Sequence, residues 1–448
     1  MLYKLLYTKL RHVDPDTKFF LLAFWNCYGA STPKPCSLKQ LASDLRIPAK
    51  VISKAVAQSV DAALLRARTQ SDGKGRPKCI YEINQSAFSD SPEILEGALN
   101  HAHMVQHVLV GEHIRAIWAG WSDDAKIALN SVSGSLEGKR VPPVRKGQLS
   151  LANRLLLMIL ISRADPFGVV RGLGSKELCL LTGVDAAAFK QRLRRLVALG
   201  FIRRHIAGVA SPIFSEKLKS IYLLNLNHLQ LSPAQDVICT AVHQRFDDQG
   251  AGYKFVTAVW IDRELFLGRS AHSAPVTVLR LFRRAPRHAF DQLAFFIYEC
   301  ASGFLSRCWR GSGSGDWKKV REVDASVRAQ VAGFFRESMV DPIGNAALDR
   351  NEVIDFFQRL IFDLASECVQ RFSQLSTVSF VTVDYILLPE HVSNSDHCLA
   401  LLILNARGGD LPVHWTVVKG YDEPVVKSVQ READIPLSMR EQSGLLTP

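Results

Sequence analysis

A short segment after Asp185 carries three closely spaced side chains that are rich in hydrogen-bond donors. Lys190, Gln191 and Arg194 recur at the three- and four-residue spacing that places side chains on one face of a helix. Lys and Arg donate hydrogen bonds to guanine edges, and Gln pairs with adenine. Arg195 lies beside them in the sequence. We interpret this segment as a candidate base-reading helix whose ligand is double-stranded DNA.

The other face of this segment is apolar, which predicts how the helix is held. Its apolar residues recur at helical spacing: Phe189, Leu193, Leu196 and Val197. Asp185 is a predicted N-cap and Gly200 a predicted stop. A shorter helix is expected just before it, capped by Ser175 and ended by Gly183.

The chain carries this pattern twice. Residues 17–25 and 37–66 overlay on residues 154–162 and 174–203 at a constant shift of 137 residues. The two copies then share Lys-x-Ile-Tyr-x-x-Asn, at 78–84 and 219–225, at a shift of 141. Each copy predicts three helices followed by a β-hairpin, with Pro48 starting the third helix of the first copy.

The step Leu-x-x-Leu-Gly-Phe-Ile-Arg-Arg at 196–204 resembles the winged helix-turn-helix superfamily, and the resemblance covers about 170 residues in two copies. It implies that each third helix enters the major groove and that each hairpin, or wing, follows the DNA backbone. The candidate DNA-binding residues are Lys190, Gln191, Arg194, Arg195, Lys50, Ser53, Lys54, Arg68, Lys74, Arg76, Lys78, Arg203 and Arg204. The second copy is favoured for base reading, and the first for backbone contacts or dimerisation.

Charge supports a polyanionic partner for the half that contains the repeat. Residues 1–243 hold 32 Lys and Arg against 18 Asp and Glu, whereas residues 244–448 hold 23 against 25. The whole chain has a formal charge of +12. The excess positive charge therefore lies with the repeated modules.

Two other patterns could do chemistry, and both lie between the copies. His101, His103, His107 and His113 are close in sequence, but no Cys or carboxylate completes a metal-ligand set. Asp124 with Glu137-Gly138-Lys139 matches a loose nuclease pattern, but it falls in a Gly/Ser/Pro-rich linker, not on a rigid strand. We therefore expect no metal, no cofactor and no catalytic residues.

Residues 244–448 predict long amphipathic helices and three strands, at 379–389, 397–406 and 413–420, with an unstructured tail from Glu423. Arg280, Arg283, Arg284 and Arg287 favour a solvated helix face over a phosphate site. No P-loop, dinucleotide or nucleophile-elbow motif occurs in this half.

The predicted fold class is α+β, with two tandem winged helix-turn-helix domains followed by a mostly helical domain with a small antiparallel sheet. The predicted domains are residues 1–102, a helix and basic linker at 103–149, residues 150–243, and a dimerisation or partner-binding domain at 244–448. We expect residues 1–245 to bind DNA on their own.

The predicted function is sequence-specific binding of double-stranded DNA by a cytoplasmic, nucleoid-associated bacterial transcription regulator that is not an enzyme. Single cysteines, no long apolar segment and a mixed N-terminal sequence favour this location over a membrane or secretion. A homodimer or a protein partner is expected through the C-terminal half. The alternatives are a replication initiator of a plasmid or mobile element, a winged-helix scaffold that binds only protein, and an enzyme with a catalytic C-terminal half.

Overall fold

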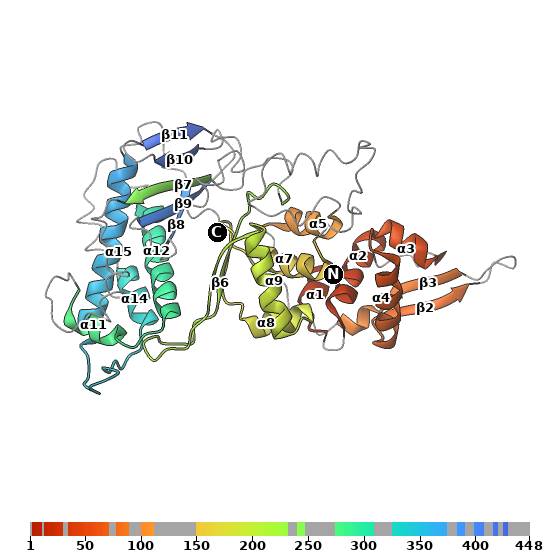
Figure 1. Ribbon diagram of the computed structural model, residues 1–448, viewed down its shortest axis with the longest axis horizontal. Helices are drawn as coiled ribbons and strands as arrows, with labels where there is room; N and C mark the ends of the chain where they lie inside the picture. Colours follow the sequence, from red (N-terminus) through yellow and green to blue (C-terminus); the bar gives the residue numbers. More distant parts are fainter. Residues whose placement is uncertain are drawn as a thin grey trace, which may run out of the picture. The chain divides into compact units, whose positions relative to one another are not determined.

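The fold is described here from a computed structural model. The residues that the structure describes are 2–10, 13–29, 35–70, 78–88, 100–111, 149–231, 240–246, 274–308, 325–373, 383–389, 398–406, 415–419 and 424–428. The chain is α+β with small antiparallel sheets (Figure 1). It divides into two compact units: Met1–Arg204 with Tyr222–Ala234, and His205–Ile221 with Gln235–Pro448.

The first copy of the repeat folds as helix, strand, helix, helix, strand, strand. Its elements are α2 (Pro15–Tyr28), β1 (Pro35–Cys36), α3 (Leu38–Asp44), α4 (Ala49–Asp61), β2 (Leu65–Gln70) and β3 (Lys78–Ile83). The three strands form one antiparallel sheet in the order β1-β3-β2. Helix α4 begins at Ala49 with Pro48 as its N-cap, so the predicted start at Pro48 is one residue early.

The second copy repeats this order of elements. It contains α7 (Leu151–Ser162), β4 (Val169–Val170), α8 (Ser175–Thr182), α9 (Ala186–Ala198), β5 (Ile202–Ile206) and β6 (Ile221–Leu224), with the sheet order β4-β6-β5. The third helices α4 and α9 have equal length and begin 137 residues apart, as the predicted register requires. The short strand after the first helix of each copy was not predicted.

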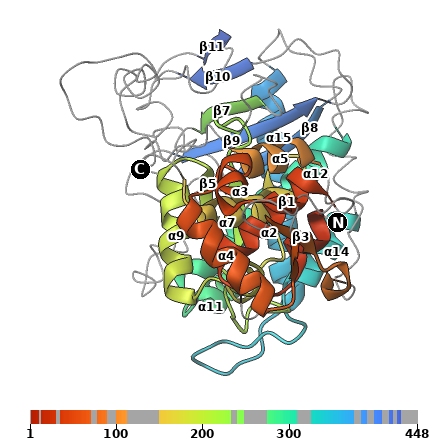
Figure 2. The ribbon, with the colours of Figure 1, turned by 90° about the vertical axis from the view of Figure 1, so that its right-hand side faces the viewer.

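A further helix accompanies each copy inside the first unit. Helix α1 (Leu2–Tyr7) packs on α2, and α5 (Ala102–Val110) packs on α7. Helices α2 and α7 lie side by side (Figures 1 and 2), and both bury long apolar runs, residues 19–24 of α2 and 155–161 of α7. The two copies therefore belong to one compact unit, and residues 112–148 of the predicted helix and linker lie outside the described residues.

The second unit is built from helices and an antiparallel sheet. Its helices are α11 (Val276–Phe282), α12 (Arg287–Cys308), α14 (Ala325–Phe334) and α15 (Arg350–Ser373). Its sheet has the order β7-β9-β8, from β7 (Thr240–Phe246), β8 (Val383–Leu388) and β9 (Cys398–Ala406). Helix α12 packs on both β8 and α15.

Three predictions for this half need correction. The third strand of the sheet is β7, whereas β10 (Trp415–Lys419) pairs with β11 (Pro424–Ser428) in a separate hairpin. Strand β11 lies in the segment expected to be unstructured. The predicted boundary at residue 243 falls inside β7, because His243 pairs with Leu401 of β9.

The second unit also contains the distal end of the second hairpin, residues 205–221, which we call the inserted wing. Phe214 of this segment forms a β-bridge with Phe335. Ser215 donates its backbone N–H to Phe334 O at 3.0 Å. Val209, Ile213 and Phe214 are buried in the same hydrophobic core as α11, α12, α14 and α15. The inserted wing is thus part of the C-terminal core.

Candidate nucleic-acid interface

Helix α9 is oriented by its cap and its apolar face. The Asp185 carboxylate accepts hydrogen bonds from the backbone N–H groups of Ala187 (2.9 Å) and Ala188 (2.8 Å), as the sequence predicted. Phe189, Leu193 and Leu196 are buried, and Val197 is half-buried. The prediction that Ser175 caps α8 is wrong, because Ser175 is the first residue of the helix and Gly174 is its N-cap. Gly183 ends α8 in the left-handed conformation, as expected.

The outward face of α9 presents four polar side chains to solvent. Lys190, Gln191, Arg194 and Arg195 are all exposed. No hydrogen bond or ion pair joins these side chains to any residue within the described ranges. Arg192 differs, because its guanidinium donates to Ser150 Oγ and Asn153 Oδ1, both at 3.2 Å, and so fastens α9 to α7. These four side chains carry about fifteen N–H donors that bind no described residue.

Helix α4 presents a weaker version of this face. Lys50 and Ser53 are exposed, but Lys54 forms an ion pair with Asp14 at 2.7 Å. Burial raises the pKa of Asp14, but hydrogen bonds from Lys54 and Thr17 outweigh it and leave the pKa lowered. The hydrogen bond that Lys54 donates to Asp14 raises the pKa of Lys54. Lys54 is therefore engaged within the copy, and α4 is less positive than α9.

The hairpin of the first copy stands in solvent. Strands β2 and β3 pair in register from Leu65 with Ile83 to Gln70 with Lys78. Every residue of β2 after Leu65 is exposed, including Arg68. Strand β3 also pairs with β1, and its residues Tyr81 and Ile83 are buried, so the side chains open to a ligand are those of β2. The predicted residues Lys74 and Arg76 lie outside the described residues, and of Lys78 only the backbone is described.

The hairpin of the second copy is not equivalent. Arg203 has a side chain that is only 2% exposed, which corrects its prediction as a phosphate contact. Arg204 is half-buried. Beyond these residues the inserted wing belongs to the C-terminal core, where Gln292 Nε2 donates to Ala207 O (2.9 Å) and Lys219 O (3.0 Å). The first hairpin alone is a free wing in the described part of the chain.

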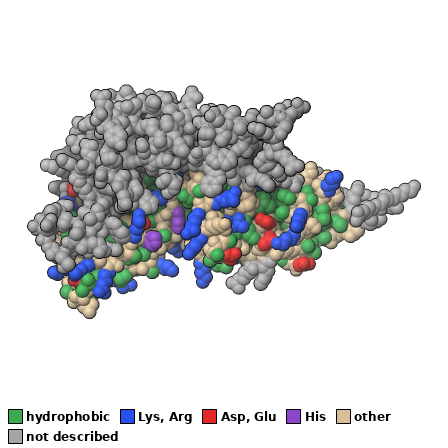
Figure 3. All heavy atoms as spheres, in the orientation of Figure 1, with side chains coloured by type: hydrophobic (Ala, Val, Ile, Leu, Met, Phe, Trp, Pro, Cys, Tyr) green, Lys and Arg blue, Asp and Glu red, His purple; other side chains and the backbone are tan. Residues whose placement is uncertain are grey.

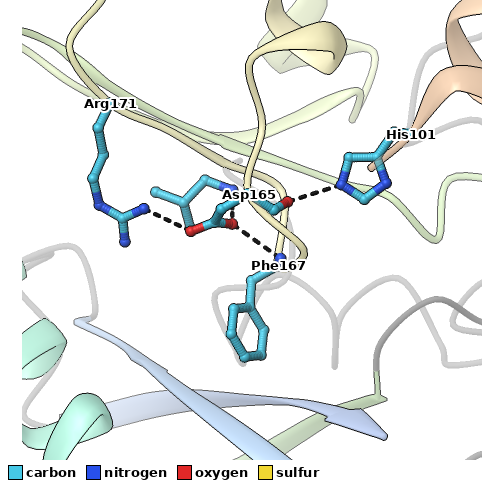
Figure 4. Close-up of polar contacts among 5 residues, drawn as sticks. His101, Asp165, Phe167 and Arg171 are labelled. Carbon is cyan, nitrogen blue, oxygen red and sulfur yellow. Dashed lines mark hydrogen bonds and ion pairs between the residues drawn. The ribbon is translucent and has the colours of Figure 1, made fainter. Parts of the chain in front are cut away.

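A polar network holds the second copy against α5 (Figure 4). The Asp165 carboxylate accepts from the backbone N–H groups of Phe167 and Val169, both at 2.9 Å, and pairs with Arg171 at 2.6 Å. His101 Nε2 lies 2.8 Å from Asp165 O, and since a carbonyl only accepts, Nε2 carries the proton. Burial lowers the pKa of His101, which favours this neutral form. His101 is thereby assigned to packing.

A buried lysine joins the two copies. Lys18 is 1% exposed, and its ammonium donates to Leu6 O (2.8 Å), Thr8 O (2.7 Å) and Leu181 O (2.6 Å). An ammonium has three N–H donors, so these carbonyls satisfy all of them. Burial lowers the pKa of Lys18 to about 7. Leu181 belongs to α8, so Lys18 connects α1 and α2 with the helix that precedes α9.

Arg154 plays the corresponding part in the second copy. Its guanidinium donates to Val108 O (2.8 and 2.9 Å) and Leu109 O (2.6 Å) at the end of α5. It also lies over the Phe19 ring of the first copy, 4.6 Å from the centroid. Sequence reasoning missed both cations, although Lys18 is the one cation of α2 and Arg154 the one charged residue of α7, each directly before a long apolar run.

The remaining candidates contribute nothing to this surface. Hydrogen bonds from Ile343 and Gly344 lower the pKa of Asp341, and Arg280 and Arg283 lower it further. Of the arginine cluster, Arg280, Arg284 and Arg287 are exposed and Arg283 is half-buried. The described residues hold no group of three or more potential metal ligands. His113, Asp124, Glu137 and Lys139 lie outside the described residues.

The described surface in Figure 3 shows more Lys and Arg than Asp and Glu side chains. Helix α9 contains four basic residues and no acidic one. Among the described residues, no helix has the length and hydropathy needed to cross a membrane. A comparison of the chain with known protein families finds no match, and a comparison with curated proteins finds none either.

Proposed function

We propose that both copies are winged helix-turn-helix domains and that the chain binds specific sequences in double-stranded DNA. The observation that carries the proposal is the α9 face, with Lys190, Gln191, Arg194 and Arg195 exposed and without partners among the described residues. The order helix, strand, helix, helix, strand, strand in both copies supports it.

The roles follow from chemistry. Lys190, Gln191 and Arg194 donate to base edges in the major groove, and Arg195 contacts a flanking phosphate. Lys50 and Ser53 of α4 make a second set of groove contacts, while Arg68 of the free wing contacts the backbone. Arg203 is left out because it is buried.

We propose further that the protein is a transcription regulator, in which the tandem copies choose the site and the second unit recruits a partner or a second copy. The experiment is selection of bound fragments from the source genome by the purified full chain, followed by sequencing. Enrichment beside promoters supports the regulator. Enrichment in repeat arrays at an origin would replace it with replication initiation.

A matched pair of variants tests the α9 face on the selected site. Arg194→Ala removes a proposed base contact and should weaken specific binding about 5- to 150-fold, with a smaller effect on unrelated DNA. Arg359→Ala is the control, because Arg359 is an exposed arginine on α15 in the other unit. Equal affinities for both variants would refute the proposed face. Absence of any enriched sequence would refute specific binding itself.

A further inference from the structure

The contacts between the two copies are reciprocal. Tyr7, at the end of α1, donates to Ser162 Oγ at 2.7 Å, and its ring lies 4.3 Å below the guanidinium of Arg163 at the end of α7. Gln106 of α5 donates to Asn26 Oδ1 at 2.7 Å, near the end of α2. Asn26 and Arg163 occupy the same position under the 137-residue shift. Each accompanying helix therefore reaches the same place on the opposite copy.

The buried cations make equivalent contacts inside each copy, which shows that the two copies are built alike. Lys18 binds the carbonyls that end α1, and Arg154 binds those that end α5. The two residues lie at neighbouring positions in the aligned first helices, since Arg154 aligns with Thr17. Helices α2 and α7 also pack directly on each other. In an interface related by a two-fold axis, each contact from the first copy to the second is matched by the same contact from the second copy to the first.

We infer that the tandem is an intramolecular pseudo-dimer, so that α4 and α9 read two half-sites in inverted orientation at one fixed spacing. This inference rests on the proposed DNA binding and names the class of DNA element. In two-fold dimers the orientation and spacing of half-sites mirror the protein. Here the half-sites differ in sequence, because α4 and α9 present different side chains, so the natural element is not a visible palindrome.

The shared core supports the fixed spacing. Lys18 is fully desolvated between α1, α2 and α8, and its three hydrogen bonds bridge both copies. A Cβ on Gly183 would lie 2.6 Å from Val13 O, so the end of α8 also meets the start of the first copy closely. Hinge motion between the copies would break these buried contacts at once, because each depends on the same close approach.

The orientation is tested by making the two helices alike. In the variant Lys50→Ala/Ser53→Lys/Lys54→Gln/Ala57→Arg, α4 takes the residues found at the aligned positions of α9. All four positions are exposed, and only the surface ion pair of Lys54 with Asp14 is lost, so folding is retained. Selection from random DNA with this variant should return an inverted repeat. A direct repeat, or a single half-site, would overturn the inference.

The spacing is tested with the wild-type protein and its own selected site. Inserting five base pairs between the half-sites turns one of them by about half a helical turn. A rigid pseudo-dimer then loses one set of contacts, and affinity should fall at least about 100-fold. Affinity that is indifferent to the insertion would overturn the inference while leaving DNA binding intact. If the wild type selects no sequence at all, the proposed function itself fails.

Discussion

Gly183 provides the sharpest test of the shared core, because the chain offers a matched control. Gly183 has φ +72° and closes α8, and a Cβ there would lie 2.6 Å from Val13 O of the first copy. Gly172 has φ +74°, but a Cβ there would have no atom within 4 Å. Both substitutions to Ala carry the left-handed backbone cost of about 1–2 kcal/mol. Only Gly183→Ala adds the clash, worth about 1–3 kcal/mol more.

The assay is hydrogen exchange of the full chain, followed by mass spectrometry. Gly183→Ala should lower the free energy of opening in α8 and also in α2 of the first copy, because Val13 must move away. Gly172→Ala should affect only the segment around β4 and α8. The reasoning is refuted if the two variants differ by less than about 0.5 kcal/mol, or if protection of α2 is unchanged in Gly183→Ala.

Three further predictions concern single side chains. Because the folded pKa of Lys18 is lowered to about 7, stability should rise between pH 7 and 10 by up to about 1.4 kcal/mol per pH unit, and urea denaturation of Lys18→Met should lack this rise. Phe214→Ala should destabilise the second unit by about 3–5 kcal/mol and speed exchange in residues 207–219, while Lys217→Ala in the same segment should not. Asp185→Ala should cost about 1 kcal/mol in α9 and leave α4 unchanged, as exchange would report.

Local signals explain why both copies could be predicted from the sequence. Asp185, Pro48 and Gly183 act within one or two turns, and helical periodicity needs only about 11–18 residues, so element types and the 137-residue register were predicted correctly. The exposed positions of α9 could be predicted because they lie on the side of the helix opposite its apolar residues. The N-cap of α8 was predicted one residue too late, at Ser175. Gly174 is the N-cap, and it has the extended backbone of a cap but no capping side chain.

Long-range contacts explain what could not be predicted. Nothing near Phe214 in the sequence indicates that it packs with Phe335, so the second hairpin read as a free wing and Arg203 as a phosphate contact. Nothing near β7 in the sequence indicates that it pairs with β9, because most of the second unit's sequence lies between the two strands. The sequence analysis did not single out Lys18 and Arg154, because their carbonyl partners lie in other helices that are distant in the sequence.

The inserted wing limits where the chain can be cut into folded fragments and where it can recombine. A fragment ending at residue 245 keeps Val209, Ile213 and Phe214 but loses the core that covers them, so it carries an exposed apolar hairpin prone to aggregation. A clean excision must instead join Arg204 to Tyr222 by a short turn and end near Ala234. A single crossover at any point of the chain would split one unit or the other, so a single crossover cannot exchange the two units as separate modules.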